Sequence, residues 1–441
     1  MKRLLILALL GLAACATTEV STPVVAGQSV CAAHLGAGTT HNGDITADET
    51  WTAAGSPHLV AADKSITAGA TLTLEPCAEV RMGAGTSLLA FGKLLALGDA
   101  THPITIAAEN PTKPFDFVTV RPGGWLDFAY VRVAGGAAGT VNGSGVIDVW
   151  GPGAEDGVAP TAAARLRHVT IDGSDHFGLT LERAGTLTPD SDDLTISHCA
   201  LGAISTRPAL ASAIPAGKYT GNAVDGIVVI SSDIMTTDTT WHDRGVPYII
   251  GEANGNGHDF RVGLGGGTRV RWTIDPGVVI RVQPAGRVLM QAAATGKVSN
   301  GVVIATGTAA KPIVFTSAAA AAAPGDWRGL VWDGAPDSAN TLDFVHVEYA
   351  GGDSQANSFH CDPNGSFSNN ENAAIAFFGE PAAPFVQNST ILASAGAGID
   401  LAYSGNALDF LSGNTFSQVA GCKVTTPRDA KGSCPATAPC P

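Results

Sequence analysis

The chain has 441 residues, of which 45% are hydrophobic and 15% are charged, and it contains 54 glycines and 25 prolines. This composition excludes a disordered chain and a bundle of long amphipathic helices, and it favours many short strands joined by tight turns. The formal net charge is −14 and no basic patch interrupts the sequence, so binding to nucleic acid is not expected, because an acidic body repels DNA and RNA.

The N-terminus has the pattern of an export signal. Lys2 and Arg3 precede the apolar run Leu4 to Leu12, which is too short to span a bilayer. The run ends in Leu12-Ala13-Ala14-Cys15, which resembles the bacterial lipobox. That resemblance implies cleavage before Cys15 and a lipid on its thiol. The alternative is an ordinary secretory peptide in which Cys15 is incidental.

The lipobox resemblance also predicts a location. Ala16 and Thr17 follow the cysteine where an Asp would favour the inner membrane, so the enterobacterial sorting rule implies an outer-membrane lipoprotein that faces the periplasm or the cell surface. More than one acyl chain gives stable attachment, and membrane lipid is therefore an expected partner. Small polar residues follow Cys15 and are typical of a tether.

One block of sequence occurs twice. Ala70 to Met82 reads ATLTLEPCAEVRM, and Val270 to Val282 reads VRWTIDPGVVIRV. Further on, LDFAYVRVAGG from Leu126 to Gly136 matches LDFVHVEYAGG from Leu342 to Gly352. Repetition on this scale indicates a solenoid. The expected divisions are a signal at 1–14, a tether at 15–49, repeat units at 50–238 and 239–425, and a tail at 426–441.

The strands within each unit are three to six residues long and are bounded by turn residues, as expected when short strands stack coil upon coil into one core. With Pro312 to Thr316 (P-I-x-F-T) and Asp326 to Leu330 (D-W-x-G-L), the pattern resembles bacterial exported proteins of the pectin-lyase-like superfamily. The resemblance implies an all-β, right-handed parallel β-helix formed by two duplicated halves. The superfamily holds lyases, hydrolases and adhesins. In the first unit, D-W-x-G-L is replaced by Asp116 to Val120, so we expect that unit to have lost whatever the motif supports.

Eight cysteines fit an exported protein with disulfides. We expect Cys31 to pair with Cys77 and Cys199, inside an apolar strand, to be a buried free thiol. The four cysteines near the C-terminus allow three connectivities, which the sequence leaves open. They are Cys361, Cys422, Cys434 and Cys440.

Two polar groups are weak candidates for a functional site. One comprises His168, Asp172, Asp175 and His176, which could bind a cation or act as acid and base. We favour the structural interpretation, in which they are outward-facing residues at a coil corner.

The other group is the acidic loop formed by Asp190, Asp192 and Asp193, where calcium is the one ion considered, and a solvated turn is the favoured interpretation. Arg121-Pro122 and Arg207-Pro208 match only part of a lyase motif. No cofactor or other metal is expected.

Aromatic and corner residues complete the sequence predictions. Trp125, Trp150 and Trp332 are candidates for a glycan-binding face. Glu75 and Asp275 recur before a proline in both units, which indicates structural corners whose carboxylates accept backbone N–H bonds.

The sequence therefore favours a non-catalytic, lipid-anchored surface or envelope protein with a role in adhesion or glycan binding, and leaves a polysaccharide lyase or hydrolase as the alternative.

Overall fold

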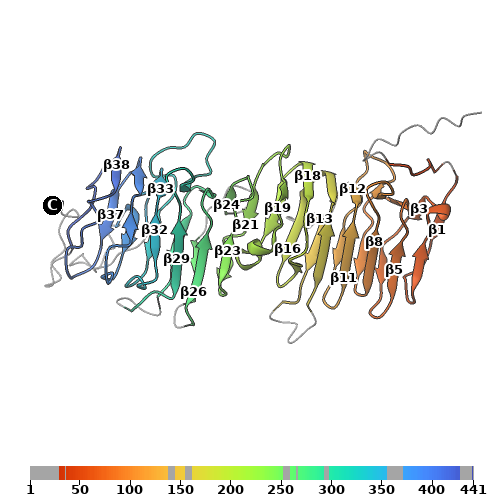
Figure 1. The fold of residues 1–441 in the computed structure, drawn as a ribbon, viewed down its shortest axis with the longest axis horizontal. Coiled ribbons are helices and arrows are strands. Elements are labelled where there is room, and N and C mark those ends of the chain that lie inside the picture. The colour runs from red at the N-terminus through yellow and green to blue at the C-terminus, as the bar shows by residue number, and fades with distance from the viewer. Residues whose placement is uncertain are drawn as a thin grey trace, which may run out of the picture.

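A computed structural model describes residues 29–34, 36–137, 145–153, 161–251, 259–264, 267–292, 297–354, 371–427 and 440. The chain forms a rod in which short strands lie side by side from the N-terminal to the C-terminal end (Figure 1). The described helices are two 3₁₀ segments, η1 (Ala53–Gly55) and η3 (Pro208–Ala213). Among the described residues, no helix has the length and apolar character needed to cross a membrane.

Within the described residues the strands form five sheets, and neighbouring strands are parallel. One sheet, here called the long sheet, has 13 strands and runs through both halves of the chain. Its strands are β4 (Lys64–Ile66), β7 (Leu88–Ala90), β10 (Val118–Val120), β13 (Gly145–Trp150), β16 (Phe177–Glu182), β19 (Gly202–Thr206), β21 (Ile227–Val229), β24 (Tyr248–Ile250), β27 (Val279–Val282), β30 (Ile313–Ser317), β33 (Val345–Glu348), β36 (Thr390–Leu392) and β38 (Thr415–Ser417).

Two further sheets belong to the first half. The six-stranded one holds β2 (Glu49–Trp51), β5 (Thr71–Leu74), β8 (Lys93–Leu97), β11 (Trp125–Ala129), β14 (Ala163–Arg167) and β17 (Thr186–Leu187). The eight-stranded one holds β1 (Thr39–His41), β3 (His58–Val60), β6 (Glu79–Met82), β9 (Ile104–Ala108), β12 (Val131–Gly136), β15 (Thr170–Ser174), β18 (Leu194–Cys199) and β20 (Gly217–Lys218).

The last two sheets belong to the second half. One holds β22 (Ile234–Met235), β25 (Asp259–Val262), β28 (Arg287–Met290), β31 (Leu330–Trp332), β34 (Ala373–Phe377) and β37 (Ala397–Leu401). The other holds β23 (Thr239–Trp241), β26 (Val270–Ile274), β29 (Gly301–Thr306), β32 (Thr341–Asp343) and β35 (Val386–Gln387). Three strands thus complete each coil, and the architecture is the predicted right-handed parallel β-helix.

Alternation along the strands builds the core. In β5 and β6 every second side chain is buried, and the buried side chains stack on those of the next coil. One continuous apolar cluster extends from Ile45 to Val424. Trp51 and Trp241, which precede the repeated block in the first and second halves, are fully buried in it. Such stacking stabilises a coil only when its neighbours are present.

The repeated corners before Pro76 and Pro276 have the same geometry. The amide of Glu75 donates to the carbonyl of Trp51, and the amide of Asp275 donates to that of Trp241, each at 3.0 Å. The Glu75 carboxylate accepts the Ala53 N–H at 3.1 Å, as predicted. The Asp275 carboxylate instead contacts His242 Nδ1 at 2.8 Å, so its expected backbone bond is replaced by a side-chain partner.

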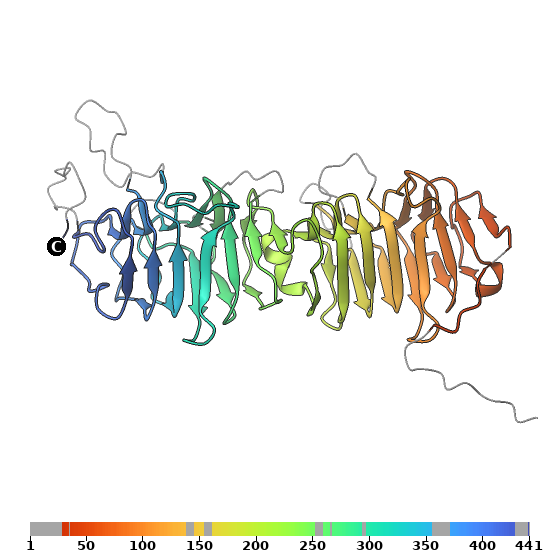
Figure 2. The same cartoon turned by 90° about the horizontal axis from the view of Figure 1, so that it is seen from above.

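The two halves are offset by one face of the rod. In the first half the long sheet receives the third strand of each coil (β7 after β5 and β6), whereas in the second half it receives the second strand (β27 after β26). The offset arises because η3 occupies a strand position between β19 and β20, visible as the short coiled ribbon midway along the rod in Figure 2. Equivalent surfaces of the two halves therefore point to different sides.

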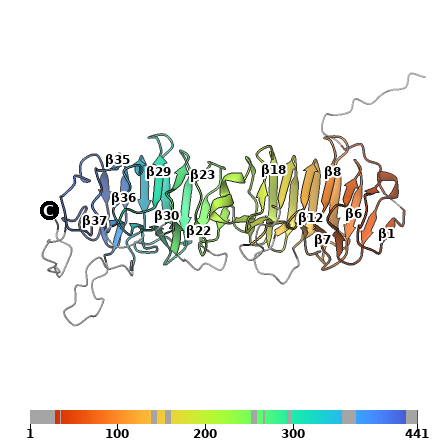
Figure 3. The same cartoon turned by 90° about the horizontal axis from the view of Figure 1, so that it is seen from below.

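The rod is continuous from one end to the other (Figure 3), and a disulfide lies near each end. Cys31 pairs with Cys77 and Cys199 is a buried free thiol, as predicted. At the other end Cys422 pairs with Cys440. The remaining predicted cysteines, Cys361 and Cys434, lie outside the described residues, as does Cys15.

Candidate ligand-binding strip

Two of the predicted polar residues form a corner ladder. His168 lies between β14 and β15, with its Nδ1 2.8 Å from the Asp193 carboxylate of the next coil and its ring stacked on Tyr130 of the previous coil at 4.3 Å. All three residues have left-handed backbone, with φ of 51° at Tyr130, 52° at His168 and 45° at Asp193. A left-handed residue at each corner turns the chain onto the next face.

The other members of the first predicted group separate along β15. Asp172 is within the strand, where it accepts bonds from Arg132 (2.5 Å) and His198 Nδ1 (2.7 Å), and these bonds lower the pKa of its carboxyl. Asp175 and His176 follow the far end of β15. The structure therefore does not bring His168 together with Asp175 and His176 in one site.

The acidic loop is also distributed among separate partners. Asp190 is exposed and contacts Arg165 Nη1 at 3.3 Å, whereas Asp193 belongs to the corner ladder. Asp192 is exposed, and its amide donates to the carbonyl of Leu166. Among the described residues, no group of three or more His, Cys, Asp or Glu side chains is arranged to hold a metal ion.

A different set of polar side chains does converge, on the outward face of the long sheet in the first half. Side chains alternate along β10, β13 and β16. Those that point inward are apolar, and those at the alternate positions, including the one at or just past the end of each strand, point outward. The parallel register aligns these outward side chains into two adjacent rows. We call them the Trp150 strip. One row is Thr119, Asp148, Thr180 and Ser205, and the other is Arg121, Trp150, Glu182 and Arg207.

Asp148 lies at the centre of the first row and is 3% exposed. Its carboxylate accepts a 2.6 Å hydrogen bond from the Thr180 hydroxyl and a 3.2 Å bond from the Thr119 hydroxyl. Burial raises the pKa of this carboxyl to about 6, although the Thr180 bond and the charge of Arg121 oppose the rise. Asp148 is thus a shielded acid held between two hydroxyl donors.

Glu182 lies in the second row and is bound to the next coil. Arg207 donates from Nε to its carboxylate at 2.9 Å, and a second guanidinium nitrogen lies 2.8 Å from the same oxygen. Arg207 also reaches Asp233 at 3.4 Å. Both ends of this ion pair are partly buried, so it fixes the two side chains against the sheet.

Trp150, also in the second row, has an arginine near its ring from each neighbouring coil. The guanidinium of Arg121, from the coil before, lies 5.3 Å from its ring centroid, and that of Arg183, from the coil after, lies 4.8 Å away. The ring remains partly exposed. The Nε of Arg121 is buried and has no hydrogen-bond partner among the described residues, so one donor beside the Trp150 ring is unsatisfied.

The three candidate tryptophans differ in exposure and in position. Trp332 is fully buried in the core, which removes it from any glycan face. Trp125 is partly exposed on β11, with the Arg165 guanidinium 6.0 Å from its ring. Only Trp150 lies within the strip. Arg121 and Arg207 stand out in the sequence as parts of an incomplete lyase motif, whereas Asp148 and Glu182 carry no such signal because their neighbours lie on other coils.

The interpretation of D-W-x-G-L in the first half requires a correction. The amide of Asp116 donates to the carbonyl of Thr86, and at the equivalent place in the second half the amide of Arg328 donates to the carbonyl of Gly286. Arg328 therefore corresponds to Asp116, and Trp327 corresponds to Phe115. Phe115 is fully buried, as Trp327 is, so the first half keeps the buried aromatic anchor. Asp326 in the second half accepts bonds from Ser317 and from the Ala323 amide, and therefore closes a loop.

Comparison with known proteins adds one match. Residues 266–361 match the model of the pectate-lyase like beta helix domain, in the second half and outside the Trp150 strip. No curated protein and no solved structure matches the chain. Together with the parallel sheets described above, this match supports a right-handed parallel β-helix as the fold of the chain.

Proposed function

We propose that the protein is a lipid-anchored β-helix of the bacterial surface or envelope that binds glycans at the Trp150 strip. The observation that supports this most is the partly exposed Trp150 ring between Arg121 and Arg183. A sugar ring placed against the exposed part of the indole makes apolar contact, and its hydroxyl or carboxylate oxygens meet guanidinium donors.

The state of the carboxylates favours binding over catalysis. A general acid or base must come within hydrogen-bond reach of the substrate. Asp148 is 3% exposed and already accepts two hydroxyl bonds. Glu182 is held by Arg207. A polymer on the outer surface therefore meets the arginines and the indole, while both acids are engaged with the protein.

One observation keeps a lyase or hydrolase as the second candidate. Asp148 and Glu182 are outward-facing carboxylates on adjacent coils with arginines beside them, and burial raises the pKa of Asp148 to about 6. Buried acids with raised pKa values are common at catalytic sites.

Incubation with a panel of uronic-acid and neutral glycans separates the two candidates. The binding proposal predicts retention on at least one immobilised glycan without release of unsaturated or reducing ends. Release that is lost in Asp148→Asn would replace the binding proposal with an enzyme. Retention on none of the glycans would refute binding at the strip.

The membrane attachment has its own test. Cys15 would carry the lipid, and the anchor would place the rod on the outer membrane, facing the periplasm or the surface. Labelled palmitate should be incorporated into the full chain and not into Cys15→Ser. Equal labelling of the variant would contradict the anchor.

A further inference from the structure

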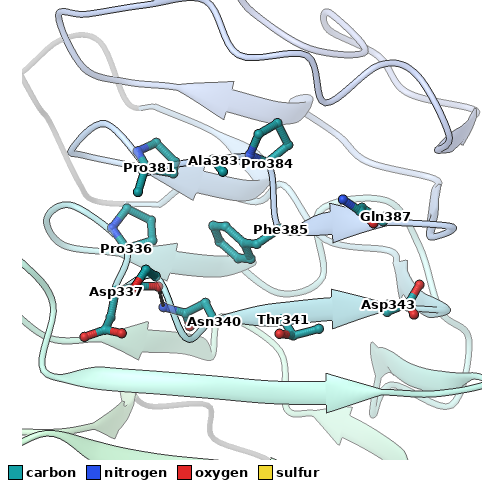
Figure 4. Close-up of a pocket in the computed structure, with 12 residues that line it drawn as sticks. Pro336, Asp337, Asn340, Thr341, Asp343, Pro381, Ala383, Pro384, Phe385 and Gln387 are labelled. Carbon is teal, nitrogen blue, oxygen red and sulfur yellow. Dashed lines mark hydrogen bonds between the residues drawn. The ribbon is translucent and has the colours of Figure 1, made fainter.

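The second half contains a pocket that is separate from the Trp150 strip. It lies where two connections stack on adjacent coils, residues 333–340 between β31 and β32 and residues 378–385 between β34 and β35 (Figure 4). It encloses about 290 Å³, at the lower limit of the roughly 300 Å³ at which small-molecule sites begin. That volume suits one small ligand rather than a long polymer.

The walls of the pocket are fixed before any ligand arrives. Pro336, Pro381 and Pro384 line it, and each has a restricted backbone (Figure 4). Asn340 ties the lower connection to the core, since its amide donates to the Asp337 carbonyl and its oxygen accepts from Trp332 Nε1 at 3.2 Å. A preformed site loses little entropy on binding.

The lining has an apolar side and a polar edge. Phe385 and the prolines form the apolar side, while Thr341, Asp343 and Gln387 project from β32 and β35 (Figure 4). Asp343 and Gln387 are register partners on adjacent strands, so their backbones are about 5 Å apart along the rod. This combination complements a pyranose, which has an apolar C–H face and hydroxyls around its edge.

Charge selects among saccharides. Asp337 is neutralised by Arg269 at 2.5 Å. Asp343 accepts a 2.8 Å bond from the Asn388 amide, and no ion pair to it is found among the described residues. An uncompensated carboxylate at the rim attracts hydroxyl donors and repels anions.

From this geometry we infer that the second half has a binding site for a single neutral sugar residue, with Asp343 and Gln387 as hydroxyl-binding side chains. The site does not depend on the Trp150 strip, because it is on the other half of the rod. In the first half the equivalent connection between β10 and β11 is only residues 121–124, too short to form such walls.

Saturation-transfer NMR on the full-length protein tests this inference, with the methyl glycosides of glucose, galactose, mannose and N-acetylglucosamine as probes and methyl galacturonide as the anionic comparator. We expect transfer to at least one neutral glycoside and none to the galacturonide. The dissociation constant should rise roughly tenfold in Asp343→Ala and in Gln387→Ala, the latter an exposed side chain that folding does not need.

Two controls isolate the pocket. Glu109→Gln removes an exposed charge in the first half and should leave binding unchanged. Trp150→Ala should also leave it unchanged, which separates failure here from failure of the strip. The inference is overturned if no neutral glycoside receives saturation, if Gln387→Ala binds as the wild type does, or if the galacturonide binds equally well.

Discussion

On two successive coils, the third strands of the two halves carry different chemistry on their outward faces. In the first half this face holds Asp148 between Thr119 and Thr180. At the equivalent coil positions of the second half, Val331 and Ala376 belong to a buried apolar cluster with Leu289, Ala373, Phe378, Ala397 and Ala402. Inward residues and corners are similar in the two halves, because every coil must stack on the next. The outward face carries no such requirement, and there the halves have diverged.

Placing an aspartate at the second-half position equivalent to Asp148 should have the largest effect on stability. Ala376→Asp would bury a carboxylate beside Val331, which has no hydroxyl, and in register with Asp400 on the next coil. An unpaired buried charge costs about 3–5 kcal/mol. Urea denaturation at pH 7.5 should show a loss of this size. A loss below about 1 kcal/mol would show that the two faces are equivalent environments.

Asp148 itself should make stability depend on pH. The pKa of Asp148 is raised to about 6 in the folded state, so folding favours the protonated carboxyl. The contribution of Asp148 to the free energy of unfolding is therefore fully present below about pH 4 and is lost as the pH rises through 6. Asp148→Asn should therefore gain on the order of 2–3 kcal/mol relative to the wild type between pH 4 and pH 8, measured by denaturation at both values. A constant difference between the two proteins would contradict a raised pKa.

The corner after the repeated acid-proline pair offers a smaller contrast. Gly277 has φ 91° and its counterpart Cys77 has φ 66°, so the first half places a side chain where the second half has none. Gly277→Ala should cost about 1–2 kcal/mol from left-handed strain alone. In a Cys31→Ser background, Cys77→Gly should stabilise relative to Cys77→Ala by a similar amount. Thermal unfolding measures both, and equal stability within either pair would refute the strain.

The sequence predicts the fold well, for a physical reason. The inward positions of β5, β6, β26 and β27 follow a strict alternation, and the repeated acid-proline corners set the strand order. The Cys31–Cys77 disulfide and the buried Cys199 also follow from local context.

The strip could not be predicted in the same way. The register of β10, β13, β16 and β19 brings together four residues from different coils, and the sequence does not show which residues are paired across coils. These residues are Arg121, Asp148, Glu182 and Arg207. The sequence does not predict the offset between the halves either, because nothing in it marks η3 as the replacement for a strand. Conversely, His168 and Asp193 looked like candidate chemistry because they are polar, and the structure places them at left-handed corners.

Glycan binding by matched variants is the most direct test of the Trp150 strip as a ligand site of the first half. Trp150→Ala should weaken binding to the retained glycan roughly tenfold or more, through loss of the aromatic contact and of the two arginine positions. Phe91→Ala, which removes another exposed aromatic ring of the first half, should bind as the wild type does. Undiminished binding by Trp150→Ala, with Phe91→Ala as the control, would contradict the assignment of the site to the Trp150 strip.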